Sequence, residues 1–111
     1  MTSSSTNLRS AVESTVGRTA PDLSGLREVW LFGSALHSAD AGDVDLLVVY
    51  DGDVIAAADA VSHRASLDRA MQDVLGLHAH VVLLNPGEAK ETRFAEREGA
   101  ELVWQFDADK G

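Results

Sequence analysis

Apolar side chains recur three or four residues apart, the spacing of one face of a helix, in three segments of the chain. The first segment begins at one of the capping residues Ser5–Asn7, and we expect it to end near Gly17. The second, residues 54–75, follows Asp53, whose side chain is placed to cap a helix. The third, residues 88–98, is rich in charge, which is typical of a helix with a solvated outer face.

Strand-like runs lie between these helical segments. Residues 27–32 (REVWLF), 43–50 (DVDLLVVY) and 77–84 (LHAHVVLL) are rich in aliphatic and aromatic side chains. The second run is apolar on both faces after its start, which is typical of a central strand. Residues 101–106 (ELVWQF) fit either a last strand or a helical extension. The alternation of helix and strand predicts an α/β (α+β) fold, a mixed β-sheet flanked by helices.

Length and composition fit one globular domain. The sequence has 111 residues, of which 45% are hydrophobic, so we expect a single domain over 1–111 with flexible ends at 2–6 and 107–111. No apolar run approaches the ~20 residues of a membrane helix, and residues 1–20 contain no apolar signal segment. The absence of cysteine favours the reducing cytoplasm. A net charge of −9 argues against direct nucleic-acid binding.

Two carboxylates open the strand expected at residues 43–50. Successive side chains of a strand point to opposite faces, so Asp43 and Asp45 share one face about 6.5–7 Å apart. Paired carboxylates at the start of an apolar strand repel each other unless a cation or hydrogen bonds offset their charge. Such hard oxygen ligands suit Mg²⁺ or Mn²⁺. Alternatively, both are solvated at the strand end, one of them capping the turn after Gly42.

A glycine and a serine end the strand before it. Gly33 lets the backbone approach a ligand closely, and the hydroxyl of Ser34 with its neighbouring amides can bind phosphate. A Gly-Ser pair is also common in ordinary turns. Combined with Asp43 and Asp45, however, it predicts phosphate-binding groups and a metal-binding pair at neighbouring strand ends.

The segments Leu31–Ser34 (LFGS) and Gly42–Val49 (GDVDLLVV) resemble the nucleotidyltransferase superfamily of the DNA polymerase β type. The resemblance is strongest to its small stand-alone members, the antitoxin-like minimal nucleotidyltransferase domains. It implies a nucleotidyltransferase-like mixed sheet that binds ATP or another nucleoside triphosphate with two divalent metals. Asp43 and Asp45 would be the catalytic metal ligands, and the Gly-Ser pair would contact the phosphates. An acceptor hydroxyl would then take the nucleotidyl group and pyrophosphate would leave.

Two features depart from the family's pattern. The loop Ala35–Gly42 has eight residues, which is short for the family, and His37 is its only candidate cation. In the strand at 77–84, His80 occupies the position of the family's third carboxylate. An imidazole can bind a metal but brings no negative charge and prefers softer ions than Mg²⁺, so His80 is the third candidate catalytic and metal-binding residue. His78 shares its face, and either joins the cluster or stays half-exposed at the strand end.

The resemblance leaves alternative functions open. In one, the domain transfers a nucleotidyl group to an acceptor, which could be a HEPN-like helical partner protein, the toxin of a toxin–antitoxin pair. The net charge of −9 fits a partner with a basic surface. In another, His80 leaves the domain catalytically weak or silent, and it acts as a binding module by contact alone. A third is a plain α/β domain with a chance Asp-x-Asp. Trp104 and Phe106 fit either core positions or an apolar patch at a dimer interface, so the sequence also allows an oligomer.

Overall fold

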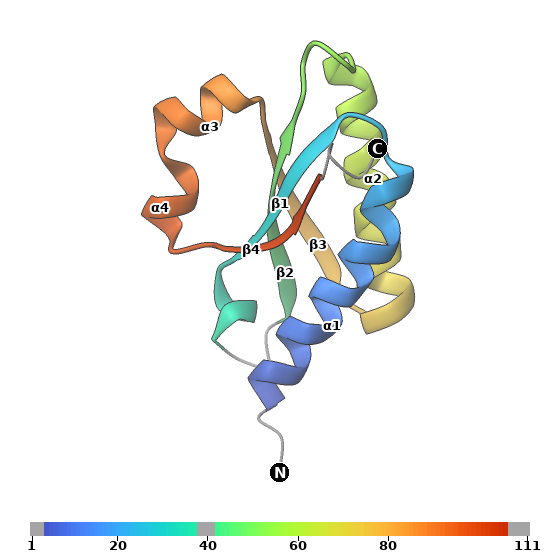
Figure 1. Cartoon of the computed structure of the whole chain (residues 1–111). Helices are drawn as coiled ribbons and strands as arrows, with labels where there is room; N and C mark the ends of the chain where they lie inside the picture. The colour runs from blue at the N-terminus through green and yellow to red at the C-terminus, as the bar shows by residue number, and fades with distance from the viewer. Residues whose placement is uncertain (1–3, 38–41, 107–111) are drawn as a thin grey trace.

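Four strands form a single mixed sheet. The computed structural model describes residues 4–37 and 42–106, and the strand order across the sheet is β3-β2-β1-β4 (Figure 1). Strand β2 runs antiparallel to β1 and parallel to β3, and β4 runs antiparallel to β1. The predicted mixed sheet is confirmed, and the segment after Ala100 is a strand. The strands are β1 (Leu26–Phe32), β2 (Asp43–Tyr50), β3 (His78–Leu84) and β4 (Glu101–Gln105).

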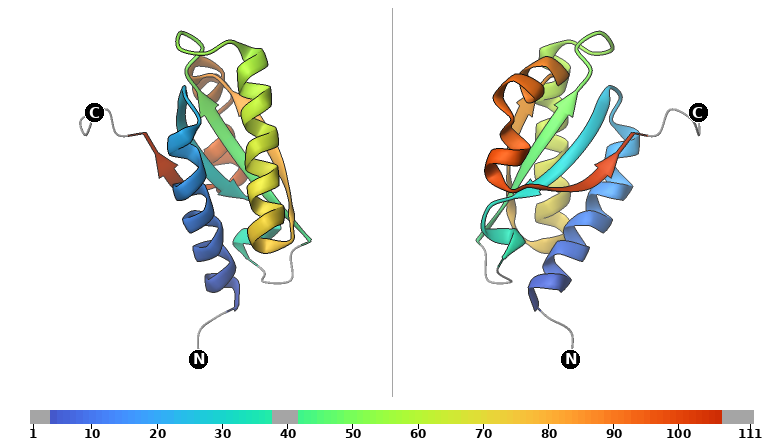
Figure 2. Two further views of the ribbon diagram at one scale, coloured as in Figure 1. Left: turned by 90° about the vertical axis from the view of Figure 1, so that its right-hand side faces the viewer. Right: turned by 60° about the vertical axis from the view of Figure 1, so that its left-hand side comes forward.

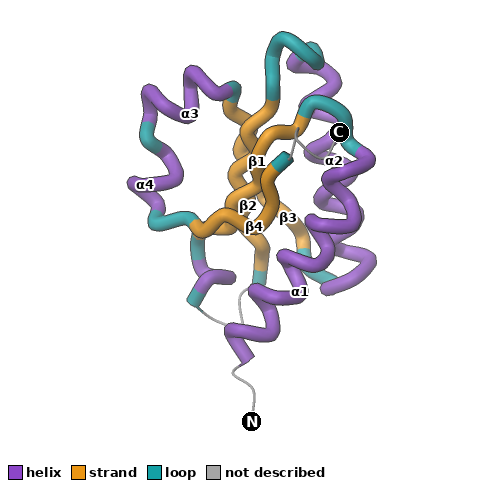
Figure 3. The backbone as a smooth tube through the Cα atoms, in the orientation of Figure 1, coloured by secondary structure: helices purple, strands orange, loops and turns teal. Residues whose placement is uncertain are grey.

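Helices flank the sheet on both sides. Figure 2 shows α1 and α2 side by side on one face, while α3 and α4 arch over the other. The tube in Figure 3 shows the same arrangement, with the two short helices set apart from the long ones. None of the described helices is long and apolar enough to cross a membrane. The helices are α1 (Ser4–Thr19), α2 (Ala57–Leu75), α3 (Pro86–Thr92) and α4 (Phe94–Glu98), with short 3-10 helices η1 (Ala20–Asp22) and η2 (Ser34–Leu36).

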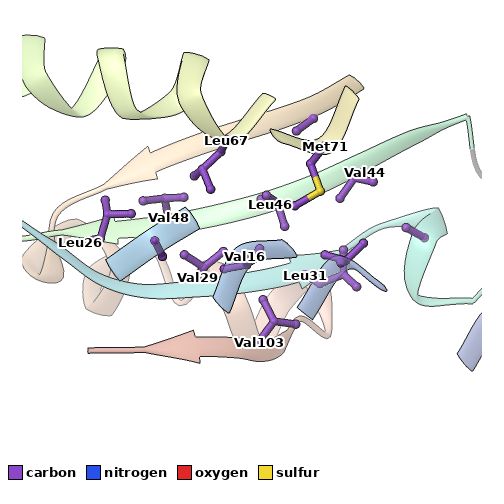
Figure 4. Close-up of a cluster of buried hydrophobic side chains, with 14 residues drawn as sticks. Val16, Leu26, Val29, Leu31, Val44, Leu46, Val48, Leu67, Met71 and Val103 are labelled. Atoms are coloured by element: carbon purple, nitrogen blue, oxygen red, sulfur yellow. The ribbon is translucent and has the colours of Figure 1, made fainter. Parts of the chain in front are cut away.

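The main hydrophobic core lies between the sheet and the layer formed by α1 and α2. Val44, Leu46 and Val48 of β2 are fully buried, and Leu67 and Met71 of α2 belong to the same cluster (Figure 4). Burial of each such side chain stabilises the fold by about 1.5–3 kcal/mol. A one-residue slip would turn these side chains to the other face. The core therefore sets which way β2 faces, and places the two aspartates of β2 on the opposite side.

Helix α2 begins later than the sequence predicts, at Ala57. The carboxylate of Asp51 accepts a hydrogen bond from the Asp53 amide at 2.9 Å, and the Asp51 carbonyl accepts from the next two amides. These bonds close a turn over residues 51–55. The prediction that Asp53 caps α2 is therefore wrong, because the carboxylate of Asp51 organises this segment instead.

The single helix predicted for residues 88–98 is two helices. Arg93 adopts a left-handed conformation (φ 53°) that ends α3, and α4 begins at Phe94. Helix α3 starts with a capping box, in which Asn85 accepts from the Glu88 amide at 2.8 Å and Glu88 accepts from the Asn85 amide at 3.0 Å. The break at Arg93 redirects the chain, so the segment arches beside the sheet (Figure 3).

At the N-terminus, α1 continues through Gly17 to Thr19, further than predicted. Residues 4–6, which we expected to belong to a flexible end, form the first turn of α1. The remaining expected ends, residues 2–3 and 107–111, lie outside the described residues.

Candidate functional site

The turn after β1 is built around one glycine. Gly33 has φ 79° and ψ −159°, a backbone conformation that is essentially restricted to glycine. A Cβ at this position would overlap the carboxylate of Asp45. Ser34 follows as the exposed first residue of η2. The Gly-Ser turn therefore lies directly beside the aspartate strand, as the sequence predicts.

The two aspartates lie at the start of β2, on the face turned away from the main core. Phe32, the last residue of β1, is paired with Asp45 in the sheet register. The side chain of Asp43 is 47% exposed and that of Asp45 is 27% exposed. Both carboxylates are thus open to a ligand from solvent, with Asp45 the more enclosed of the two.

His80 completes a cluster of three side chains. It is paired with Asp45 in the parallel register of β2 and β3. Its Nε2 lies 3.9 Å from Oδ2 of Asp43, and its Nδ1 lies 3.7 Å from Oδ1 of Asp45. Both distances exceed the ~3.2 Å limit of an ordinary N–H···O hydrogen bond. The imidazole thus lies next to both carboxylates without being tied to either.

His78 does not join this cluster. Its Nδ1 lies 3.6 Å from Oδ1 of Asp68, on α2. The same carboxylate accepts hydrogen bonds from the Ala79 amide at 2.7 Å and from Nε2 of Gln72 at 2.9 Å. The bond from Ala79 is the main cause of the lowered pKa of Asp68. Of the two arrangements that the sequence allowed, the structure has the one in which only His80 lies at the aspartates.

The residues present fit a metal ion that takes part of its coordination from the protein and the rest from phosphate oxygens and water. Among the described residues, no three His, Asp or Glu side chains are grouped closely enough to hold a metal by themselves. Mg²⁺ in proteins commonly takes only one or two carboxylates and fills its remaining positions with phosphate oxygens and water. Asp43 and Asp45, half-exposed and on one face, match that donor set.

The sequence did not predict a cavity on the same face of the sheet as the two aspartates. Trp30, Leu47 and Val49 line its sheet side, and Ala89 and Ala95 line its helical side. The segment 88–98 was expected to be a solvated helix, because its alternating charges dominate the pattern. The alanines spaced between those charges were the available signal.

Comparison with known proteins identifies the fold. No family model and no curated protein matches the sequence. The structure is similar to the crystal structure, at 1.40 Å resolution, of a candidate nucleotidyltransferase from Sulfolobus solfataricus. The TM-score is 0.58 at 23% sequence identity, and the match covers 97% of this chain and 87% of that one. The chain therefore has a nucleotidyltransferase-like fold, with a mixed four-stranded sheet flanked by helices.

Proposed function

We propose that this domain binds a nucleoside triphosphate, ATP or another, together with Mg²⁺ or Mn²⁺, and transfers its nucleotidyl group to an acceptor. One observation carries the proposal. The glycine turn at Gly33 lies against Asp45, and Asp43, Asp45 and His80 meet at the same end of the sheet. A backbone cradle beside paired carboxylates suits a polyphosphate that is held through a divalent cation.

Each residue has a distinct role in this proposal. Asp43 and Asp45 hold the metal, and His80 lies where it can serve as a third ligand. Gly33 admits the phosphates close to the backbone, and the exposed hydroxyl of Ser34 donates a hydrogen bond to them. A bound divalent metal supplies charge that stabilises the attacking and leaving oxygens. The acceptor oxygen forms a bond to the α-phosphorus, the bond from that phosphorus to the pyrophosphate oxygen breaks, and the acceptor proton passes to solvent or to a base.

The proposed acceptor is a partner protein. The resemblance to antitoxin-like minimal domains points to a HEPN-like helical toxin as that partner, in the cytoplasm. The net charge of −9 supports a partner with a basic surface, because opposite charge accelerates association.

A second function is favoured by His80. The imidazole of His80 lies beside both carboxylates, and an imidazole in either protonation state adds no negative charge for a hard cation. In this alternative the domain keeps the fold and the binding of its partner, and neutralises that partner by contact without transfer.

Titration calorimetry tests the binding step. Each of the four ribonucleoside triphosphates is titrated with Mg²⁺ or Mn²⁺ into the wild type and the Asp43→Asn/Asp45→Asn variant. The control is Asp59→Asn/Asp73→Asn, which makes the same charge change at exposed positions of α2. We expect the site variant to bind its preferred triphosphate about a hundredfold more weakly and the control to bind like the wild type. Wild-type protein that binds no triphosphate with either metal would refute the proposal.

A label-transfer assay separates the two functions. ATP labelled at its α-phosphate is incubated with the domain and a HEPN-like helical protein as the proposed partner. Label that reaches the partner and is lost in the Asp43→Asn/Asp45→Asn variant supports the transferase. Triphosphate binding and complex formation without label on the partner support the silent module.

A further inference from the structure

A cavity of about 370 Å³ lies between the sheet and the helices α3 and α4. On the sheet side it is lined by the large apolar side chains of Trp30, Leu47 and Val49. On the opposite side, the apolar lining comes from small residues, chiefly Ala89 and Ala95. Figure 1 shows the arch that α3 and α4 make beside the sheet.

The cavity exists because the two sides do not fill the space between them. Layers of helix and sheet normally interdigitate at close-packed density. An alanine carries only a Cβ, so Ala89 and Ala95 fill little of the space between the helices and the sheet. Apolar atoms that face an empty space lose contacts they would make in a packed core. A hollow of this size falls within the range of about 300–1,000 Å³ found for small-ligand pockets.

The sheet register joins this cavity to the candidate site. Asp45 is followed on the same face of β2 by Leu47 and then Val49, each step about 6.5–7 Å. Across β1, their paired residues are Phe32, Trp30 and Glu28 in the same order. Phe32 packs edge-on against Phe94 of α4, with ring centroids 5.1 Å apart. Those two rings hold α4 at the site end, and the floor of the cavity begins one step beyond Asp45. The same face passes from carboxylates to apolar side chains to Glu28.

One polar group of the cavity is held in place by the indole ring. The Glu28 carboxylate accepts a hydrogen bond from Nε1 of Trp30 at 2.9 Å through its Oε1. Its second oxygen remains able to accept from a ligand. An aromatic wall with a carboxylate beside it suits a planar ring that carries an amino group. Lys90 lies on the α3 side of the lining and Arg27 on the β1 side.

We propose that this cavity holds the base of the nucleotide, and that Glu28 selects bases with an exocyclic amino group. The inference rests on the proposed function, which places the triphosphate at Asp43 and Asp45. Adenine, cytosine and guanine each offer an amino group to the Glu28 carboxylate. Uracil has no amino group, and its single ring N–H is flanked by two carbonyl oxygens, which the carboxylate repels. The triphosphate and the base then lie on one continuous face of the sheet.

The first test fills the cavity. Ala95→Leu extends a side chain toward Trp30, and Ala65→Leu makes the same change on the exposed surface of α2 as a control. We expect Ala95→Leu to weaken the binding of ATP with Mg²⁺ by about tenfold or more, the worth of one stacked base. Binding of inorganic tripolyphosphate with Mg²⁺, which has no base, should not change. Ala65→Leu should bind both ligands as the wild type does.

The second test changes the selecting group and leaves the cavity open. Glu28→Gln keeps an oxygen for the Trp30 indole but adds an amide that can donate to uracil. We expect the preference for ATP over UTP to fall by about tenfold in this variant. Trp30 fluorescence in a Trp104→Phe background should respond to ATP and to adenosine, and not to tripolyphosphate.

The outcomes separate this inference from the function on which it rests. Equal ATP affinity in Ala95→Leu and the wild type, or an unchanged ATP-to-UTP ratio in Glu28→Gln, overturns the base site while triphosphate binding stands. If the wild-type protein binds neither ATP nor tripolyphosphate, the proposed function itself is overturned. A selective loss of ATP binding in Ala95→Leu, with tripolyphosphate binding retained, supports the base site.

Discussion

Replacing Gly33 by alanine places a methyl group where the carboxylate of Asp45 lies. The backbone at Gly33 has φ 79° and ψ −159°, which an L-residue with a Cβ rarely adopts. The variant Gly33→Ala therefore meets two separate penalties. The backbone must be strained or must move, and the Asp45 side chain must turn away from the site.

A second glycine provides a reference for the cost of backbone strain alone. A non-glycine residue in the conformation of Gly33 costs about 1–3 kcal/mol. Gly76 at the end of α2 also has a positive φ of 69°, but a Cβ there would meet no atom within 4 Å. Gly76→Ala should cost only the backbone strain, about 1–2 kcal/mol. The excess destabilisation of Gly33→Ala over Gly76→Ala then measures the clash with Asp45 together with the greater backbone strain of the Gly33 conformation.

Thermal unfolding followed by circular dichroism measures the stability, and calorimetry with ATP and Mg²⁺ measures the site. A loss of 1 kcal/mol lowers the melting temperature of a domain of this size by roughly 4 °C. We expect Gly33→Ala to melt below Gly76→Ala and to bind ATP about tenfold or more weakly, while Gly76→Ala keeps wild-type affinity. If both variants melt together and bind ATP equally, the close approach of Gly33 to Asp45 has no role.

Three further changes test other parts of the structure. His80→Asp should lower the melting temperature in the absence of metal, because three carboxylates repel one another. Mg²⁺ should restore the melting temperature of this variant and raise its label transfer. A melting temperature that does not change when Mg²⁺ is added contradicts the role of position 80 as a third ligand. Asp68→Ala removes the acceptor of the Ala79 amide and should cost about 1–2 kcal/mol in urea unfolding at neutral pH. Because the folded-state pKa of Asp68 lies below 3.8, this contribution is complete above pH 3.8 and should disappear as the pH falls through the folded-state value; a difference that persists in strong acid contradicts it. Leu31→Ala should cost about 2–5 kcal/mol in urea unfolding, whereas Leu102→Ala, at a 37% exposed position, should cost about 1 kcal/mol or less.

Local patterns in the sequence were sufficient for much of the fold and part of the site. The apolar run of β2 predicted a central strand, and strand alternation predicted that Asp43 and Asp45 share a face. The Gly-Ser pair predicted a turn where backbone and ligand approach closely, and Gly33 has the positive φ that such a turn requires. Pro86 lies in the first turn of α3, a position where proline is well tolerated. Each of these features depends on residues close together in the chain, so the sequence contains the information needed to predict it.

Helix boundaries were harder to predict, because neighbouring side chains compete for the same backbone groups. Asp51 and Asp53 are both good capping residues, and the sequence does not show that Asp51 will take the Asp53 amide. The end of α3 at Arg93 depends on one residue adopting a left-handed conformation that arginine seldom takes.

The face on which each strand residue lies, and the position of the carboxylates relative to the apolar run, could be predicted because side-chain alternation is a property of the local backbone. The partners that those residues meet depend instead on how distant segments pack together. By alternation His78 and His80 are equivalent, and the parallel register pairs Asp43 with His78 and Asp45 with His80. The side chain of His78 nevertheless lies at Asp68 of α2, whereas that of His80 lies near both aspartates. Likewise, the small side chains of Ala89 and Ala95 leave a cavity only because α3 and α4 are separated from the sheet beside Trp30, Leu47 and Val49. These outcomes depend on contacts between segments far apart in the sequence, and packing of the whole domain sets those contacts.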